Sequence, residues 1–419
     1  MKLRKLIILL GIIPCLAFGG CKYGNDPQSS TESVQEQSVT VSEQISAESS
    51  AAESQPSEVS EEKPVLIPTK EDLDSIEDYA TKFYVKRLSN EMKYHFVTLY
   101  HAALKFQKNV ELAAPISDND LTMLMFLLNY DCPELIHLGG DYAPEYDPEG
   151  NATAVSFTYC MKENEYSKAR DELEKVRKIV VEKTAGKSEY NQEKAIYDMI
   201  FQNVVYKEED TTSGSIYGAL VKNVARCEGF SKSFAWCMRK AGLECMCVVG
   251  AQLWNENSAY SNHSWNIAKI DGEYYNVDIT VDNVRRTESE VTAPLYGFLN
   301  TDDNTTYENR SVEKSLARLG IPKCVSMKKN YHILNNLYIP EGEATEEKLL
   351  SILDSNFTGS GFSDLSIRYQ SFQDYQDCYE LIQRLVINYI NNKGVVFAPI
   401  YYYNELSHTV MIDRSSNAR

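Results

Sequence analysis

The sequence predicts an α+β protein in which a helix that carries a cysteine packs on an antiparallel sheet. Apolar residues recur at helical spacing after Cys227 as far as Gly242, a natural helix stop. Two segments with strand-like alternation flank Asp271-Gly272, a dipeptide typical of a two-residue hairpin turn. Helical patterns before this core and a mixed pattern after it indicate a helical N-terminal unit and a small α+β C-terminal tail.

The N-terminus has the features of a secretory signal. Basic residues among the first five precede an apolar run that ends in Phe18-Gly19-Gly20-Cys21, which resembles a bacterial lipobox. We therefore expect residues 1–21 to be a lipoprotein signal peptide, with Cys21 as the lipidated first residue of the mature chain. Cleavage by an ordinary signal peptidase, which would release a soluble secreted protein, is the alternative.

Residues 22–69 are expected to form a disordered tether. The segment is rich in Ser, Glu and Gln and has no helical or strand periodicity. Between Asp26 and Glu62 stand nine acidic residues and no basic one, which is half of the formal net charge of −18. This acidic balance argues against a nucleic-acid partner. The tether would lift the folded part off the membrane, so we expect an extracytoplasmic protein that is lipid-anchored to the bacterial cell membrane.

Residues 70–186 are predicted to form a mainly helical N-terminal domain. The apolar positions of this region follow a helical period in most windows and alternate in one short window. The expected elements are helices over 71–88, over 91–112, from Ser117-Asp118 onward and over 163–184, and one strand over 155–161.

Residues 187–325 are predicted to form the central domain, which contains the hairpin. The Asp271-Gly272 turn pairs Ile270 with Glu273. Counting outward, His263 and Asp278 become diagonal neighbours on one face of a strand pair that continues to Thr280, about 7–8 Å apart at the backbone. The opposite face is expected to be the packed side, with Ala268, Ile270, Tyr275, Val277 and Ile279.

Cys227, His263 and Asp278 follow one another in the chain order of a thiol triad. Unpaired amide N–H groups and the macrodipole at a helix N-terminus favour a thiolate at Cys227. The imidazole would take the thiol proton, and the carboxylate would orient the ring. Each residue alone is more often structural, as a core thiol, a strand histidine or a turn-forming aspartate. Their joint arrangement indicates catalysis.

The motifs around these residues resemble those of the transglutaminase-like superfamily, which has a papain-related fold. The motifs are Cys227-Glu228-Gly229-Phe230, His263-Ser264-Trp265-Asn266 and Tyr275-Asn276-Val277-Asp278-Ile279-Thr280. The resemblance extends over about residues 70 to 325 and implies a thiol enzyme without a cofactor. Family members often have Thr-Trp-Asp where this chain has Thr280-Val281-Asp282, which leaves substrate preference open.

An oxyanion on the substrate would be stabilised in part by the backbone N–H of Cys227. A side chain upstream would be the second donor, and Tyr217 is the candidate. The alternative for Tyr217 is an aromatic that packs against the cysteine helix.

The C-terminal region, residues 326–419, is predicted to be a small α+β domain. Helices are expected over 346–353 and 378–390, and strands over 367–369 and 395–403. Upstream, Cys245 and Cys247 lie on a predicted strand over 244–252, where alternation turns both thiols into the core, so we expect no metal site. Apart from Cys15, Cys21 and Cys227, seven cysteines remain, so at least one is free or paired with another chain.

These patterns leave three functions open. The first is a membrane-tethered thiol acyl-transfer enzyme that acts on amide bonds of proteins or peptides, by hydrolysis or by transamidation. The second is a non-catalytic surface module for binding or scaffolding that keeps the fold. The third is a cell-wall peptide hydrolase of another papain-like family. The expected partners are a protein or peptide substrate, with the cell wall as one candidate source, and the membrane through Cys21.

Overall fold

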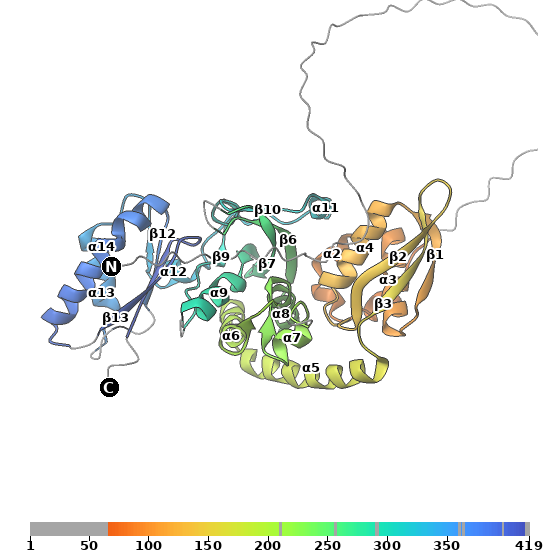
Figure 1. Ribbon diagram of the computed structural model, residues 1–419, viewed down its shortest axis with the longest axis horizontal. Helices are drawn as coiled ribbons and strands as arrows, with labels where there is room; N and C mark the ends of the chain where they lie inside the picture. The colour runs from red at the N-terminus through yellow and green to blue at the C-terminus, as the bar shows by residue number, and fades with distance from the viewer. Residues whose placement is uncertain are drawn as a thin grey trace, which may run out of the picture. The chain divides into compact units, whose positions relative to one another are not determined.

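The computed structural model describes most of the chain beyond the predicted tether (Figure 1). The predicted signal peptide, Cys21 and nearly all of the predicted tether lie outside the described residues. No helix within the described residues is both long enough and apolar enough to cross a membrane. The described residues are 66–208, 212–254, 258–289, 293–358, 362, 365–395 and 398–414.

The N-terminal region combines short helices with a three-stranded sheet, in which β3 lies between β1 and β2 and pairs antiparallel with both. The strand expected over 155–161 is present as β3, with shifted bounds, whereas β1 and β2 were not foreseen in a region predicted to be mainly helical. Its elements are α1 (Lys70–Asp74), a 3₁₀ turn (Tyr79–Thr81), α2 (Phe83–Arg87), α3 (Asn90–Leu104), β1 (Asn109–Ile116), α4 (Asp118–Tyr130), β2 (Leu138–Tyr146) and β3 (Ala152–Tyr159).

Two of the helices predicted in this region are wrong in extent. The helix expected over 71–88 is broken after α1, and Asp78 has a left-handed φ of 57° that a continuous helix cannot contain. The helix expected over 91–112 ends at Leu104. Phe106 has a φ of 55°, and the bonds from the N–H of Phe106 to the Ala103 carbonyl and from the N–H of Gln107 to the Ala102 carbonyl form a Schellman motif. Strand β1 follows.

The central region contains a five-stranded antiparallel sheet in the order β10-β6-β7-β8-β9. Helix α8 lies beside strands β6 and β7, as Figure 1 shows. The elements are α5 (Glu163–Thr184), α6 (Glu189–Asn203), β4 (Val205–Tyr206), α7 (Ile216–Leu220), β5 (Val224–Ala225), α8 (Cys227–Lys240), β6 (Cys245–Gln252), β7 (Ser261–Ile270), β8 (Glu273–Val277), α9 (Ile279–Ser289), β9 (Leu299–Thr301), α10 (Asp303–Thr306), β10 (Arg310–Val312) and α11 (Lys314–Ala317).

Both faces of the central sheet are buried. The face predicted to be the packed side lies in one core cluster with apolar residues of α8, including Phe230 and Phe234. The other face, with Trp265 and Ile267, packs into a second cluster that contains Phe83 and other residues of the N-terminal region. Burial on both faces fixes the register of β7, because a slip by one residue would exchange the two sets of side chains.

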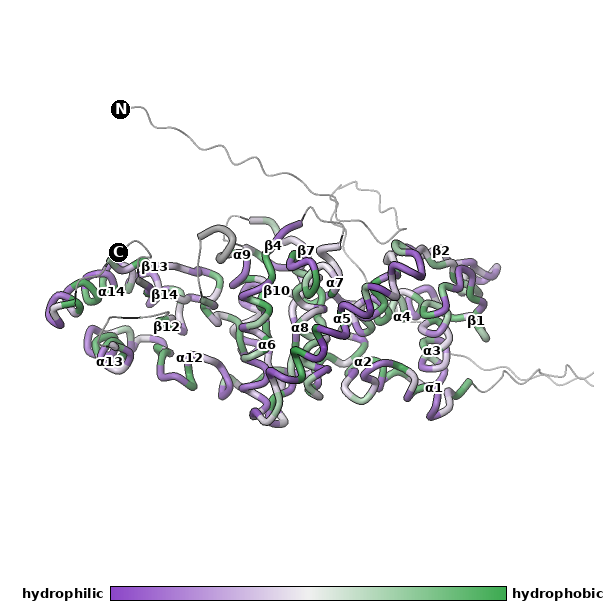
Figure 2. Tube along the Cα trace, turned by 90° about the horizontal axis from the view of Figure 1, so that it is seen from below, coloured by the Kyte–Doolittle hydropathy of each residue, from purple (hydrophilic) through white to green (hydrophobic). Residues whose placement is uncertain are grey.

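The C-terminal region is a four-stranded sheet with helices, in the order β11-β12-β14-β13, and it has its own core cluster. The two predicted helices and the two predicted strands are present with wider or shifted bounds, and α12, β11 and β14 were not predicted. Hydrophilic and hydrophobic residues alternate along α14 in Figure 2, and its apolar residues are buried. The elements are α12 (Tyr331–Leu334), β11 (Tyr338–Ile339), α13 (Glu346–Asn356), β12 (Leu365–Tyr369), α14 (Phe372–Asn392), β13 (Pro399–Asn404) and β14 (Thr409–Arg414).

Candidate active site

Cys227 is the first residue of α8, as the sequence predicts, and its side chain is half-buried. The first amide N–H groups of a helix have no partner within the helix, so this position offers donors to a negative charge. Gly229 explains the Cys-x-Gly pattern. A Cβ at Gly229 would lie 2.1 Å from the carbonyl oxygen of Ser213, which accepts a hydrogen bond from the N–H of Arg226. Glycine therefore lets the turn that contains Ser213 approach the first turn of α8.

The hairpin brings His263 and Asp278 together. Ile270 pairs with Glu273 as predicted, and both turn residues have positive φ, 49° at Asp271 and 87° at Gly272, as a type I′ turn requires. Nε2 of His263 lies 2.7 Å from Oδ2 of Asp278, and both side chains are buried. The predicted contact between the imidazole and the carboxylate is present.

The strand that was expected to continue to Thr280 ends instead at Val277. Helix α9 begins at Ile279, and Oδ1 of Asp278 accepts a hydrogen bond from the N–H of Thr280 at 3.0 Å. Asp278 therefore has the position and the contact of a helix N-cap, which is why the strand stops there. One of its carboxylate oxygens caps the helix, and the other contacts His263.

His263 and Asp278 shift each other's pKa. Burial lowers the pKa of His263, but the charge and hydrogen bond of Asp278 and the interaction with Cys227 outweigh it and raise this pKa to about 9. Burial raises the pKa of Asp278, but the charges of His263 and Arg310 together have the larger, opposite effect. The pKa of Asp278 therefore lies below its usual value. An imidazolium that faces an ionised carboxylate is thus the favoured state near neutral pH.

Arg310 contacts this pair, Gln252 contacts Arg310, and both were missed by sequence reasoning. Nη2 of Arg310 donates to Oδ2 of Asp278 at 2.8 Å, and Nε of Arg310 donates to Oε1 of Gln252 at 3.0 Å. Both side chains are buried. Strand β10 brings Arg310 opposite Gln252 on β6. A short strand that lies 32 residues after Asp278 gives no local signal of this pairing.

Tryptophan and serine side chains complete the surroundings of His263. The ring of Trp254 meets the imidazole edge to face, with centroids 5.4 Å apart, and Trp265 stacks on it at 6.2 Å. The hydroxyls of Ser264 and Ser231 lie 3.0 Å apart and join β7 to α8. These contacts fix the position of the strand that carries the imidazole relative to the helix that carries the thiol.

The charged residues next to Cys227 form a second group. The carboxylate of Glu228 accepts from Arg226 at 2.8 Å and from Lys232 at 2.6 Å. Burial raises the pKa of Glu228, but the two cations lower it below its usual value. Two cations on one carboxylate leave a net positive charge beside the first turn of α8.

The hydroxyl of Tyr217 donates to Glu172 at 2.8 Å, and its ring packs against the central core cluster. This hydroxyl thus has a carboxylate acceptor on α5. The oxyanion role that the sequence suggested for Tyr217 stays a prediction, without a contact in its support.

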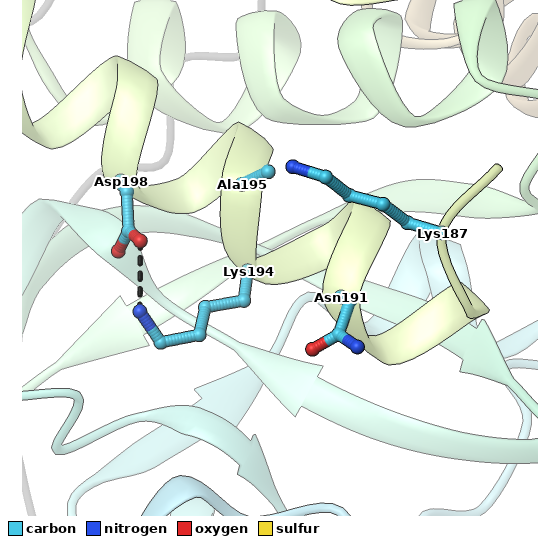
Figure 3. Close-up of a pocket in the computed structure, with 5 residues that line it drawn as sticks. All are labelled: Lys187, Asn191, Lys194, Ala195 and Asp198. Atoms are coloured by element: carbon cyan, nitrogen blue, oxygen red, sulfur yellow. Dashed lines mark hydrogen bonds and ion pairs between the residues drawn. The ribbon is translucent and has the colours of Figure 1, made fainter. Parts of the chain in front are cut away.

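A surface hollow of about 340 Å³ lies on α6 and contains none of the three predicted triad residues (Figure 3). Lys194 and Asp198 form an ion pair at 2.8 Å along its wall. The hollow therefore does not mark the candidate site. Its lining residues are Lys187, Asn191, Lys194, Ala195 and Asp198.

Six of the seven described thiols outside the candidate site are buried, and the seventh, Cys160, is exposed. All eight cysteines in the described part of the chain are free. Cys245 and Cys247 are buried in the core, as predicted. Within the same described residues, no group of three or more His, Cys, Asp or Glu side chains is arranged to hold a metal ion.

The solved structures that resemble this chain include three of low sequence identity. A candidate cysteine protease from Cytophaga hutchinsonii is 15% identical, with a TM-score of 0.23, over 33% of this chain and 61% of that one. A TGase is 16% identical, with a TM-score of 0.25, over 41% and 50%. A candidate protease from Parabacteroides distasonis is 12% identical, with a TM-score of 0.20, over 33% of each chain. The chain thus spans at most about three fifths of these structures.

Among curated proteins, no match to the chain was found. The family model described as the transglutaminase-like superfamily matches residues 164–279, from α5 to the start of α9. The match is narrower than the resemblance expected over about 70 to 325, and it begins within the predicted N-terminal domain. It contains Cys227, His263 and Asp278. Residues 164–279 of this α+β chain therefore match the core of the transglutaminase-like superfamily.

Proposed function

We propose that this protein is a thiol acyl-transfer enzyme that acts on amide bonds of proteins or peptides. The observation that carries the proposal is the 2.7 Å contact between His263 and Asp278, with Cys227 at the start of the adjacent helix. Asp278 holds Nε2 of the imidazole, so Nδ1 is the nitrogen left to exchange a proton with the thiol.

The reaction would proceed in two steps. The thiolate of Cys227 attacks the amide carbon and forms the C–S bond, while the developing oxyanion accepts hydrogen bonds from amide N–H groups at the start of α8. The C–N bond then breaks, and the imidazolium of His263 gives its proton to the leaving amine. In the second step His263 takes a proton from water or from an amine, which attacks the thioester and releases Cys227. Water gives hydrolysis, and an amine gives transamidation.

The first experiment measures the reactivity of the thiol in the full-length protein. Peptide mapping after brief treatment with iodoacetamide reports alkylation of Cys227, with the exposed Cys160 as a reference thiol in the same chain. We expect Cys227 to react at least about tenfold faster than Cys160 near neutral pH, because the imidazolium stabilises the thiolate. His263→Ala should remove this difference, whereas His101→Ala, a change in a half-buried histidine that contacts Ser75, should not.

Equal rates at Cys227 and Cys160 would contradict an activated thiol and favour a non-catalytic binding module. Where Cys227 is fast, incubation with a protein substrate and a fluorescent primary amine separates the two outcomes of the thioester. New amino termini indicate hydrolysis, and label on the substrate indicates transamidation. Release of stem peptides from purified peptidoglycan would instead indicate a cell-wall peptide hydrolase.

Anchoring to the extracytoplasmic face of the membrane belongs to the same proposal and rests on the sequence around Cys21. Replacement of Cys21 by serine would remove the acceptor of the lipid. We expect the wild-type protein to partition with membranes and Cys21→Ser to be released from them. Equal partitioning of both proteins would contradict the anchor and leave the proposed chemistry unaffected.

A further inference from the structure

Asp278 is held by more groups than orientation of a histidine requires. Its Oδ2 accepts from both His263 and Arg310, its Oδ1 accepts from the N–H of Thr280, and its own N–H donates to the Phe298 carbonyl at 3.0 Å. The carboxylate is therefore fixed by contacts from three elements and one loop. Arg310 supplies the one permanent charge among them.

Arg310 is itself held in place by Phe298 and Gln252. Its guanidinium lies over the ring of Phe298, with 4.0 Å between Cζ and the ring centroid, and its Nε donates to Gln252. Phe298 is also the residue whose carbonyl binds the N–H of Asp278. A planar guanidinium can span Gln252 and Asp278 at once through its fork of donors, which a lysine ammonium cannot do in the same way.

The charges of the site balance when Arg310 is counted. With Cys227 as thiolate and His263 as imidazolium, the four groups Cys227, His263, Asp278 and Arg310 alternate in sign and sum to zero. Without Arg310 the same state would place a net negative charge in a buried site, which is costly at low dielectric. Asp278 also faces two groups on neighbouring helices, Asp282 and Tyr197, and Arg310 faces Tyr307 and Arg368.

We propose that Arg310, oriented by Gln252 and Phe298, is a positioning residue that keeps Asp278 ionised and aimed at His263. The inference rests on the proposed function, since it concerns the same site. Arg310 acts through Asp278 and need not touch the substrate. A mere structural role would affect stability without affecting the titration of the site.

The test is the pH profile of Cys227 alkylation in the full-length protein, from about pH 4 to about pH 9. The charge of Arg310 lowers the pKa of Asp278, so Arg310→Gln raises it, and the carboxylate then becomes neutral at a higher pH. We expect the acid limb of the profile to move up by about one pH unit, which is about a tenfold lower rate at a fixed pH on that limb.

Arg310→Lys keeps the positive charge and tests whether the two donor groups of the guanidinium, to Gln252 and to Asp278, are needed. We expect its acid limb to stay near that of the wild type, and its maximal rate to fall about threefold to tenfold because one ammonium cannot hold Gln252 and Asp278 together. If Arg310→Gln does not fold, the maximal rate of Arg310→Lys alone tests the positioning role of Arg310. Arg239→Lys is the matched control, since Arg239 is equally buried and paired with Asp131 at the other end of α8.

The outcomes separate cleanly. An unchanged acid limb in Arg310→Gln, a maximal rate of the wild-type value in Arg310→Lys, or an equal shift in Arg239→Lys would overturn the positioning role. A slow Cys227 in the wild-type protein would overturn the proposed function instead, before any variant is compared. A shift in Arg310→Gln alone, with a lower rate in Arg310→Lys, supports the inference.

Discussion

Two buried arginine–aspartate pairs lie near opposite ends of α8 and differ in what they leave unpaired. All three guanidinium nitrogens of Arg239 are bonded, to the Asp131 carboxylate, the Asp131 carbonyl and the Cys245 carbonyl. In the other pair, Asp278 is shared between Arg310 and His263, and Nη1 of Arg310 is buried without a partner. Every guanidinium nitrogen of Arg239 thus has a hydrogen-bond partner, whereas one nitrogen of Arg310 has none in the described part of the chain.

Two of the buried side-chain atoms that lack a hydrogen-bond partner lie beside the candidate triad. They are Nη1 of Arg310 and Nε2 of Gln252, which have no hydrogen-bond partner among the described residues. A buried polar group without a partner costs about 1–3 kcal/mol, so such a cluster lowers stability. Structural pairs avoid this cost, whereas sites that must bind or exchange protons accept it. The difference agrees with the role proposed for the Asp278 pair in the candidate site and with a structural role for the Asp131 pair.

Substitution of Asp278 should have the largest effect on activity. Asp278→Ala removes the group that orients the imidazole and stabilises its charge, so we expect a loss of amide-cleaving or alkylation rate on the order of 10³-fold or more. Rates are measured per folded molecule, after the folded fraction has been determined by circular dichroism. A folded Asp278→Ala protein with nearly wild-type rates would remove the distinction between the two pairs.

Substitution of Asp131 should lower the stability of the protein and leave the reactivity of Cys227 nearly unchanged. Asp131→Ala leaves Arg239 buried without its carboxylate, so we expect the free energy of unfolding to fall by about 3–5 kcal/mol. The alkylation rate of Cys227 per folded molecule should change by less than about threefold, because Asp131 makes none of the contacts described above for Cys227, His263 and Asp278. Urea unfolding measures the first quantity, and peptide mapping measures the second. A large loss of rate with unchanged stability would contradict a structural role.

The sequence was sufficient for the local parts of this site. The Asp271-Gly272 turn defined the hairpin register, and that register places His263 near Asp278 even though the strand ends at Val277. The apolar period after Cys227 defined α8 from its first residue. In each case the determining signal lies within a few residues, where turn geometry and helical spacing act directly.

The partners that come from distant segments could not be predicted. Arg310 reaches Asp278 only because β10 adds to the edge of the sheet beside β6, and nothing near Arg310 indicates that strand partner. The same limit applies to β1, where apolar residues after Leu104 continue a helical pattern although the backbone turns at Phe106. Periodicity describes a face but does not say where a positive φ ends the helix.

The pH dependence of the free energy of unfolding should show the smallest effect. It also distinguishes the Arg310–Asp278 pair, which contacts a histidine, from the Arg239–Asp131 pair. The pKa of His263 rises from about 6.5 to about 9 on folding, so the protonated ring stabilises the fold. This contribution is fully present below about pH 6.5 and is lost as the pH rises through about 9, with an upper limit of roughly 3 kcal/mol. The Arg239–Asp131 pair contains no histidine and adds no such term.

We therefore expect the free energy of unfolding of the wild-type protein to fall more steeply than that of His263→Ala between about pH 7 and about pH 10. Asp131→Ala should keep the steep wild-type slope at a lower overall stability. Urea unfolding at several pH values measures all three slopes. Parallel curves for the wild type and His263→Ala would mean that Asp278 does not stabilise the imidazolium of His263. The contrast between the Arg239–Asp131 pair and the Arg310–Asp278 pair would then lose its electrostatic basis.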